Sequence, residues 1–301
     1  IRSAMDQILK FETISQYNAF NKNETLHPLV NVIDLAKAGR KKNGRVSFGF
    51  YVVYFKEVKC GDMRYGCHNY DYDEGTLVFL APGQVVGFEN NEYYEPKGYA
   101  LVFHPDLIKG TNLGRHIDHY NFFSYEVHEA LHLSEAERKV ILDCFYKIDY
   151  ELQHAIDQHS KTLIVNNIEL FLNYCMRFYD RQFITRDTVN KGLVERFETL
   201  LNDYFNSDKP KSIGLPSVAY CADQINLSAN YFGDLVKKET GKTAQEYIQL
   251  KVMDIAKEKI FDTSKSLSEI AYELGFKYPQ HFSRSFKQHV GYSPNEYRLM
   301  N

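Results

Sequence analysis

The 301-residue chain has no tryptophan, only five cysteines and no apolar run long enough to cross a membrane. A membrane-spanning helix needs about 20 consecutive apolar residues, so the sequence predicts no transmembrane segment. Residues 1–10 also lack the basic and then apolar pattern of a secretory signal peptide. We therefore expect a cytoplasmic protein.

The cysteines are odd in number and widely scattered, which fits neither a disulfide framework nor a paired zinc motif. We expect free and mostly buried thiols at Cys60, Cys67, Cys144, Cys175 and Cys221.

Net charge is also small, at −3, and residues 189–301 carry 15 basic against 14 acidic side chains. Charge alone therefore does not indicate a nucleic-acid partner. Apolar residues make up 44% of the chain and charged residues 25%, the usual balance for a globular protein with a buried core. The length suits two domains.

Residues from about 11 to 104 have the composition of short strands separated by turns. Residues 46–55 are rich in the Val, Phe and Tyr that strands favour, and 76–81 and 99–103 are further short apolar runs. Turn residues such as Asn43-Gly44 lie between them at hairpin spacing. The pattern predicts an antiparallel barrel or sandwich.

From Ser134 to Tyr179 the apolar residues recur at helical steps of three and four. Ser134 and Glu137 have the spacing of a capping box. Two stripes predict an antiparallel helix pair: Ile141, Cys144, Phe145, Ile148 and Leu152, and then Leu163, Ile164, Ile168, Phe171, Leu172, Cys175 and Phe178. The pair either packs on its own β domain or forms part of a dimer seam. The polar stretch at 185–188 predicts a hinge. We expect residues 189–205 to form a further helix and residues 206–210 to form a loop after it.

The last 90 residues contain an internal repeat with an offset of 50 positions. Five identical pairs share this offset: Phe232/Phe282, Lys237/Lys287, Gly241/Gly291, Glu246/Glu296 and Tyr247/Tyr297. Ala222 and Ala271 are 49 positions apart.

Each copy predicts a helix, a tight turn and a second helix. The first copy has helices over 218–224 and 228–240, and the second has helices that start at Ser266 and near Tyr278. This is the helix-turn-helix arrangement, whose second helix enters the DNA major groove. Between the copies, a helix capped at Thr243 is predicted to run to about Phe261, a length of about 28 Å.

These residues form a dense pattern: Ile270-Ala271-x-x-Leu274-Gly275-Phe276, His281-Phe282-Ser283-Arg284-x-Phe286-Lys287 and Gly291-x-Ser293-Pro294-x-x-Tyr297-Arg298. It resembles the signature of AraC/XylS-type transcriptional regulators over about 100 C-terminal residues. The resemblance implies a DNA-binding activator that works with RNA polymerase, without catalysis or a cofactor. Gly75 and Pro82-Gly83 resemble the second motif of a cupin, which implies a cupin-like barrel. Lys251 stands where such proteins often carry Arg.

Spacing places Phe232, Leu235, Val236, Phe282 and Phe286 in the core of the two second helices. Asn and Gln can pair with adenine, Arg with guanine, and Lys with phosphate. The candidate DNA-binding residues are therefore Ser228, Asn230, Lys237, Tyr278, Gln280, His281, Arg284 and Lys287. For each one, plain solvated surface is the alternative. Asp234 has the wrong charge to contact a phosphate. Its two alternative roles are discrimination between bases and pairing with Lys238.

The main alternative function is a metal-dependent cupin enzyme with a helical appendage. His68 has no second histidine two residues on, and Gln84, Val85 and Val86 offer no metal ligand after Pro82-Gly83. We therefore expect no metal, and a barrel that binds a small-molecule effector. Candidate lining residues are Tyr51, Tyr54, Tyr65 and His68.

The resulting prediction is an α+β multidomain chain. Residues 1–130 form a cupin-like antiparallel β-barrel that senses an effector. Residues 131–186 form a helix pair that mediates dimerisation. Residues 187–301 form an all-α DNA-binding domain with helix-turn-helix motifs at about 216–240 and 266–290. The expected partners are operator DNA, a small-molecule effector, RNA polymerase and a second copy of the chain.

Overall fold

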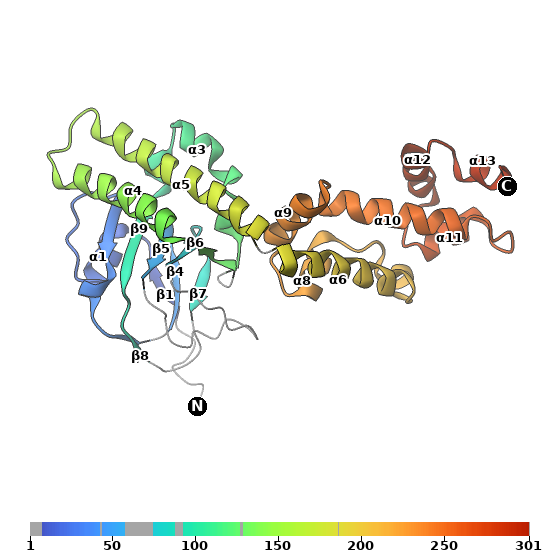
Figure 1. The fold of residues 1–301 in the computed structure, drawn as a ribbon, viewed down its shortest axis with the longest axis horizontal. Helices are drawn as coiled ribbons and strands as arrows, with labels where there is room; N and C mark the ends of the chain where they lie inside the picture. The colour runs from blue at the N-terminus through green and yellow to red at the C-terminus, as the bar shows by residue number, and fades with distance from the viewer. Residues whose placement is uncertain are drawn as a thin grey trace. The chain divides into compact units, whose positions relative to one another are not determined.

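A computed structural model describes residues 8–42, 44–57, 75–87, 93–126, 129–185 and 187–300. The chain forms two compact units that divide between Ile184 and Thr185 (Figure 1). The first unit mixes strands and helices, whereas the described residues of the second form helices and no strand. The α+β class and the all-α C-terminal region are therefore as predicted.

The centre of the first unit is a five-stranded antiparallel sheet with the order β10-β6-β5-β9-β2. Its strands are β2 (Val30–Asp34), β5 (Tyr51–Lys56), β6 (Thr76–Leu80), β9 (Gly98–Phe103) and β10 (Leu131–His132). A three-stranded sheet contains β1 (Leu9–Phe11), β4 (Arg45–Phe48) and β7 (Val85–Gly87), and β3 (Lys41–Lys42) pairs with β8 (Tyr93–Tyr94). The two larger sheets share one core, in which Phe48 packs with Val52 and Val102.

Three features of this unit differ from the sequence prediction. The described strands form three open sheets, and no strand pairing closes them into one barrel. Strands β1 and β4 run parallel, which the long connection between them allows. Residues 14–20, expected among strands and turns, form helix α1 (Ile14–Phe20), because Thr13 and Gln16 make a capping box at its start.

The opposite face of the five-stranded sheet is covered by helices. Figure 1 shows α4 (Glu135–Gln153) and α5 (Ser160–Thr185) crossing this face. The predicted apolar stripes of both helices are buried, except that Leu163 is 43% exposed. Short helical turns complete the unit: η1 (Leu35–Ala38), α2 (Pro105–Ile108), α3 (Asn112–His116), η2 (Ile117–His119) and η3 (Asn121–Ser124).

Polar side chains near the C-terminal end of α5 hold the edge strand β10. The Arg181 guanidinium donates to both carboxylate oxygens of Glu137, at 3.0 and 2.6 Å, and to the His132 carbonyl at 2.6 Å. The Gln182 amide accepts from the His132 N–H at 2.8 Å and donates to the Ala130 carbonyl at 3.2 Å. The last turns of α5 are therefore fixed to the sheet just before the second unit begins.

The second unit contains eight helices in its described residues. They are α6 (Asp187–Phe205), α7 (Lys209–Ile213), α8 (Val218–Ile225), α9 (Ala229–Thr240), α10 (Ala244–Lys259), α11 (Leu267–Glu273), α12 (Pro279–Val290) and α13 (Pro294–Leu299). Two predictions need correction here. A short helix, α7, begins within the predicted loop 206–210, and α10 ends at Lys259 rather than near Phe261.

The segment after α7 and the turn after α11 meet at a close contact between the backbones of Gly214 and Gly275. A Cβ on Gly275 would lie 2.7 Å from the carbonyl carbon of Gly214, so no other residue fits there without displacement. Both glycines have positive φ, and Gly275 directly follows Leu274, the C-cap of α11. The contact joins the segment after α7 to the turn of the second helix-turn-helix copy.

Candidate nucleic-acid interface

The first helix-turn-helix consists of α8, a tight turn and α9. The Ser217 hydroxyl accepts a hydrogen bond from the Tyr220 N–H at the start of α8. Asn226 ends that helix in the left-handed conformation, and the Leu227 N–H donates back to the Ala222 carbonyl at 3.0 Å. Ser228 then caps α9 by accepting from the Tyr231 N–H. The turn therefore contains only two residues between one helix and the cap of the next.

The second copy repeats this construction with α11 and α12. The helix starts at Ser266 as predicted, where Ser266 and Glu269 form a capping box, and the Phe276 N–H donates to the Ala271 carbonyl at 2.9 Å. This bond is the equivalent of the Leu227–Ala222 bond. The turn of the second copy has one more residue before the cap of its second helix, which explains why the two alanines are 49 rather than 50 positions apart. Pro279 begins α12 at a position where its missing N–H is not needed.

Phenylalanine side chains fix the inner faces of α9 and α12. Phe232 and Phe282 are fully buried, and the other three predicted core positions, Leu235, Val236 and Phe286, are at most 2% exposed. The Phe232 ring packs edge-on against Phe197 of α6, with centroids 4.9 Å apart. In the second copy, Phe282 contacts Phe276 at 5.3 Å and Phe286 at 5.8 Å. Each second helix therefore has a defined inner and outer face.

The outer faces carry most of the predicted DNA-binding residues. Asn230 and Lys237 are exposed on α9, and the same holds on α12 for Gln280, His281, Arg284 and Lys287. Tyr278, just before α12, is 51% exposed and its ring lies 5.3 Å from that of His281. Ser228 is half-buried because it caps α9.

Several of these side chains have no partner inside the protein. In the described part of the chain, no hydrogen bond or ion pair occupies Asn230, Lys237, Gln280, Arg284 or Lys287. Arg298 is different, since its guanidinium donates to the carbonyls of Ile260 at 2.7 Å and Lys265 at 3.2 Å. Arg298 therefore has a structural position, whereas Arg284 is available to an external acceptor.

Two outer-face positions were missed by sequence reasoning. Gly233 follows Asn230 by three residues and Ser283 follows Gln280 by three, so both lie on the same stripe as the predicted contacts. The helical spacing alone could have identified them.

The two predicted effector residues that the structure describes, Tyr51 and Tyr54, lie on opposite faces of the five-stranded sheet. Tyr51 stacks on Phe103 at 4.9 Å and contacts Phe123 at the same distance, on the helix-covered face of the sheet. Tyr54 packs on the core between the two sheets, and its hydroxyl lies 2.7 Å from that of Tyr17. Tyr65 and His68 lie outside the described residues, as do Cys60 and Cys67. Cys144, Cys175 and Cys221 are free and buried, as predicted.

Residues 221–300 match the family described as a helix-turn-helix domain. The lactose operon transcription activator of Staphylococcus xylosus is 31% identical over 244 residues, which cover 79% of this chain and 80% of that protein. The chain belongs to the AraC/XylS family of transcriptional regulators. The probable transcriptional regulator LumQ of Photobacterium leiognathi is 24% identical, covering 75% and 83% of the two chains. The transcriptional activator RhaS of Salmonella paratyphi A is 25% identical, covering 77% and 86%.

The AraC/XylS assignment gives α8–α9 and α11–α12 the role of helix-turn-helix motifs in a transcription regulator. In the described part of the chain, no three His, Cys, Asp or Glu side chains come close enough to hold a metal ion. Nor is any described helix both long enough and apolar enough to cross a membrane.

Proposed function

We propose that this AraC/XylS-type regulator reads its operator with α9 and α12, each placed in one of two adjacent major grooves. The carrying observation is the repeated stripe of exposed polar side chains that have no hydrogen bond or ion pair among the described residues. Recognition helices use such side chains for base edges and phosphates. Helix α10 separates the two copies by 16 residues, or about 24 Å of helix, which suits neighbouring grooves about 34 Å apart.

Individual roles follow from side-chain chemistry. Gln280, His281 and Arg284 contact bases from α12, while Asn230 and the α9 cap Ser228 contact bases from the start of α9. Lys237 and Lys287 stand at equivalent positions one turn before the helix ends and contact phosphates. Tyr278 flanks the start of α12 and packs against the backbone of the DNA.

The first unit serves as the regulatory part, with residues 1–130 as a cupin-like effector domain. The core between its two larger sheets contains several aromatic side chains, and the part-buried pair of hydroxyls from Tyr17 and Tyr54 is a polar group among them. Pockets for small molecules combine such apolar walls with a few polar groups. An effector that separates these sheets would also move β10, to which Arg181 and Gln182 attach the end of α5.

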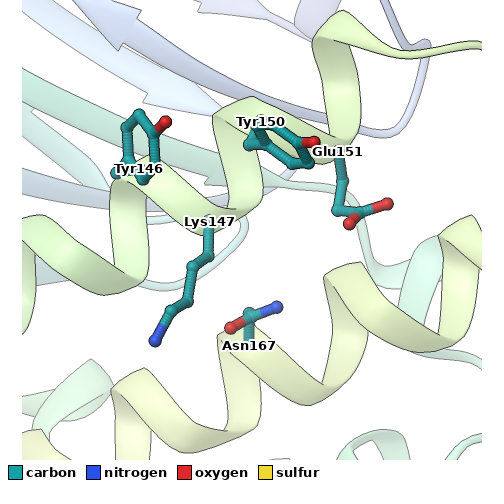
Figure 2. Close-up of a pocket in the computed structure, with 5 residues that line it drawn as sticks. All are labelled: Tyr146, Lys147, Tyr150, Glu151 and Asn167. Atoms are coloured by element: carbon teal, nitrogen blue, oxygen red, sulfur yellow. The ribbon is translucent and has the colours of Figure 1, made fainter.

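Residues 131–186 provide the dimer contact, through the outer face of α4. Tyr146 and Tyr150 are 66% and 50% exposed there, and beside them lies a pocket of about 330 Å³ that Asn167 of α5 helps to line. Figure 2 shows Lys147 extending from α4 toward α5. Lys147 and Glu151 on one face allow charge pairing with a second copy across a two-fold axis. The dimer activates transcription in the cytoplasm by contacting RNA polymerase. Activation, as opposed to repression, is supported by the two relatives that are transcription activators, the lactose operon activator and RhaS.

Selection of bound sequences from a randomised duplex library, at a fixed physiological salt concentration, tests the proposal. We expect a motif of two blocks about one helical turn apart. Arg284→Ala should relax specificity at one base pair of one block and cost about 1–3 kcal/mol. Binding that is weak, equal on all sequences and strongly salt-dependent would show phosphate contact alone and contradict the proposal.

A further inference from the structure

We propose that Arg298 is a positioning residue for operator reading: together with Tyr297 it fixes recognition helix α12 to the end of α10, and it thereby sets the spacing of the two DNA blocks that the protein accepts. The inference rests on the DNA-reading function proposed above and adds the part of the chain that determines operator spacing. Arg298 acts through α12 and does not contact the DNA itself.

The Arg298 side chain of α13 is bonded to the segment that joins α10 to the second helix-turn-helix. Its Nε donates to the Ile260 carbonyl at 2.7 Å, and its Nη2 donates to the carbonyls of Lys265 at 3.2 Å and Asp262 at 3.4 Å. Ile260 is the C-cap of α10, and Lys265 directly precedes Ser266, the N-cap of α11. One guanidinium therefore holds both ends of the connection between these helices.

The neighbouring residue, Tyr297, connects α13 to the recognition helix. Its ring lies edge-on to that of Phe286, with centroids 5.4 Å apart, and 5.5 Å from that of Phe261, just beyond α10. Phe286 is fully buried on the inner face of α12, whose outer face carries Arg284. Helix α13 therefore contacts α12 through Tyr297 and the end of α10 through Arg298.

The first copy holds its recognition helix by a different means. The positions 50 residues before Tyr297 and Arg298 are Tyr247 and Ile248, which lie in α10 itself. Tyr247 packs on Phe197 of α6 at 5.3 Å, and Ile248 is fully buried. Helix α10 continues for 16 residues, whereas α13 has six, too few for a helix that is stable by itself. The guanidinium bonds thus do in the second copy what burial along α10 does in the first.

Arginine is suited to this position because a guanidinium presents its N–H donors in one fixed plane, as a fork. A lysine ammonium keeps the charge but lacks the fork that reaches the carbonyls of Ile260 and Lys265 together. The C-terminal end of α10 is also the negative end of the helix dipole, which favours a cation there. Both effects stabilise one orientation of α13 against α10.

The consequence for DNA follows from the size of one base-pair step. Adding one base pair between two sites moves them apart by about 3.4 Å and rotates them by roughly 35° about the duplex axis. A recognition helix that is fixed to α10 cannot follow this change without losing contacts. A recognition helix that pivots at the end of α10 can follow it in part. We therefore expect a narrow spacing preference in the protein and a broader one when the Arg298 bonds are lost.

The test uses the full-length protein, the duplex that it selects, and duplexes with one base pair added or removed between the two blocks. Wild type should bind the altered duplexes several-fold more weakly than the selected one. Arg298→Ala should bind the selected duplex more weakly than wild type does, and it should distinguish the altered duplexes less. Its affinity should fall with salt as steeply as that of wild type, because no phosphate contact is lost. An unchanged ratio between the duplexes, or a salt slope smaller by about one, overturns the inference.

Two further variants keep the test decisive if Arg298→Ala does not fold. Arg298→Lys should broaden the spacing preference in the same direction and to a smaller extent, and wild-type behaviour would contradict the role of the fork. Tyr297→Ala should also broaden the preference. Tyr297→Phe is its matched control, since the Tyr297 hydroxyl has no partner among the described residues, and it should leave the preference unchanged.

Failure of this inference differs from failure of the proposed function. If wild type distinguishes the spacings and Arg298→Ala keeps the same ratio, reading by two helices stands and the positioning role is wrong. If wild type selects no duplex with two blocks, or binds every spacing equally, the proposed function itself fails.

Discussion

The two units of the chain are specified by interactions of different range. In the second unit, capping boxes join residues three apart at Thr243, Ser266 and Ser293. Left-handed residues end α8, α9 and α12. In the first unit, the bonds from Arg181 to Glu137 and from Gln182 to His132 join residues 44 and 50 positions apart. The first unit therefore depends on pairings that form only when the whole fold is in place.

This difference in range also explains why only the second unit contains a detectable sequence repeat. A local set of caps, apolar steps and glycines can be copied as a block, because it needs little from the rest of the chain. Equivalent positions in the two copies should then have similar energetic roles.

The largest expected effect tests the equivalence of the copies. Phe232→Ala and Phe282→Ala each empty a fully buried site, so each should reduce the free energy of unfolding by about 3–5 kcal/mol. Urea unfolding of the full chain, with the transition of the second unit followed separately, measures both. A loss in one copy that is several times that in the other would show that the copies are not energetically equivalent.

A smaller loss should follow from breaking the long-range bonds of the first unit. Arg181→Ala removes two charge-assisted hydrogen bonds to Glu137 and one to the His132 carbonyl, and should cost about 2 kcal/mol. Lys139→Ala is the control, since the Lys139–Glu135 ion pair is exposed and local and should contribute far less to stability. Equal effects in urea unfolding would argue against a special role for the α5–β10 bonds.

The next effect concerns the buried Tyr17–Tyr54 pair. Tyr17→Phe leaves the Tyr54 hydroxyl without this partner and should cost about 1 kcal/mol, whereas the double variant with Tyr54→Phe should cost less than the sum of the singles. Burial raises the pKa of both phenols, so only the unfolded chain ionises as the pH first passes about 10. Wild-type stability should therefore fall above that pH, and more steeply than that of the double variant.

The smallest expected effect is a loss of stability of the second unit at acidic pH. Hydrogen bonds from the cap residues lower the pKa of Glu246, Glu269 and Glu296. Their contribution is present above the unfolded pKa of about 4.3 and is lost as the pH falls through the lower folded value. Replacing all three with Gln, which still caps, should flatten the fall in melting temperature between about pH 5 and pH 3. Glu258→Gln, an exposed change in α10 outside the caps, should not.

The difference in range also explains what could be predicted from the sequence. The helix starts at Ser134, Thr243 and Ser266 were predicted correctly because their signals lie within a few residues. The parallel pairing of β1 with β4 was not, because Leu9 and Val46 meet through a register that no local pattern encodes. Helix α1 was missed because its seven residues are too few to show a clear helical period, although its Thr13–Gln16 capping box was readable.

The candidate DNA-binding face was largely predictable for the same reason. A buried phenylalanine in each recognition helix fixes which side chains face outward, so Asn230, Gln280 and Arg284 could be placed by spacing alone. The effector residues could not, since Tyr51 and Tyr54 were grouped without knowing which face of β5 each occupies. Alternation put them on opposite faces, one against Phe103 and the other against the core between the sheets.

Guanine methylation interference on the selected operator tests the central claim most directly, because methylation at N7 blocks the major groove. The account predicts two interfering patches about one helical turn apart on one face of the duplex. Arg284→Ala should abolish interference in one patch, and Asn230→Ala should weaken binding through the other. A single patch, or interference unaffected by Arg284→Ala, would contradict reading by two recognition helices.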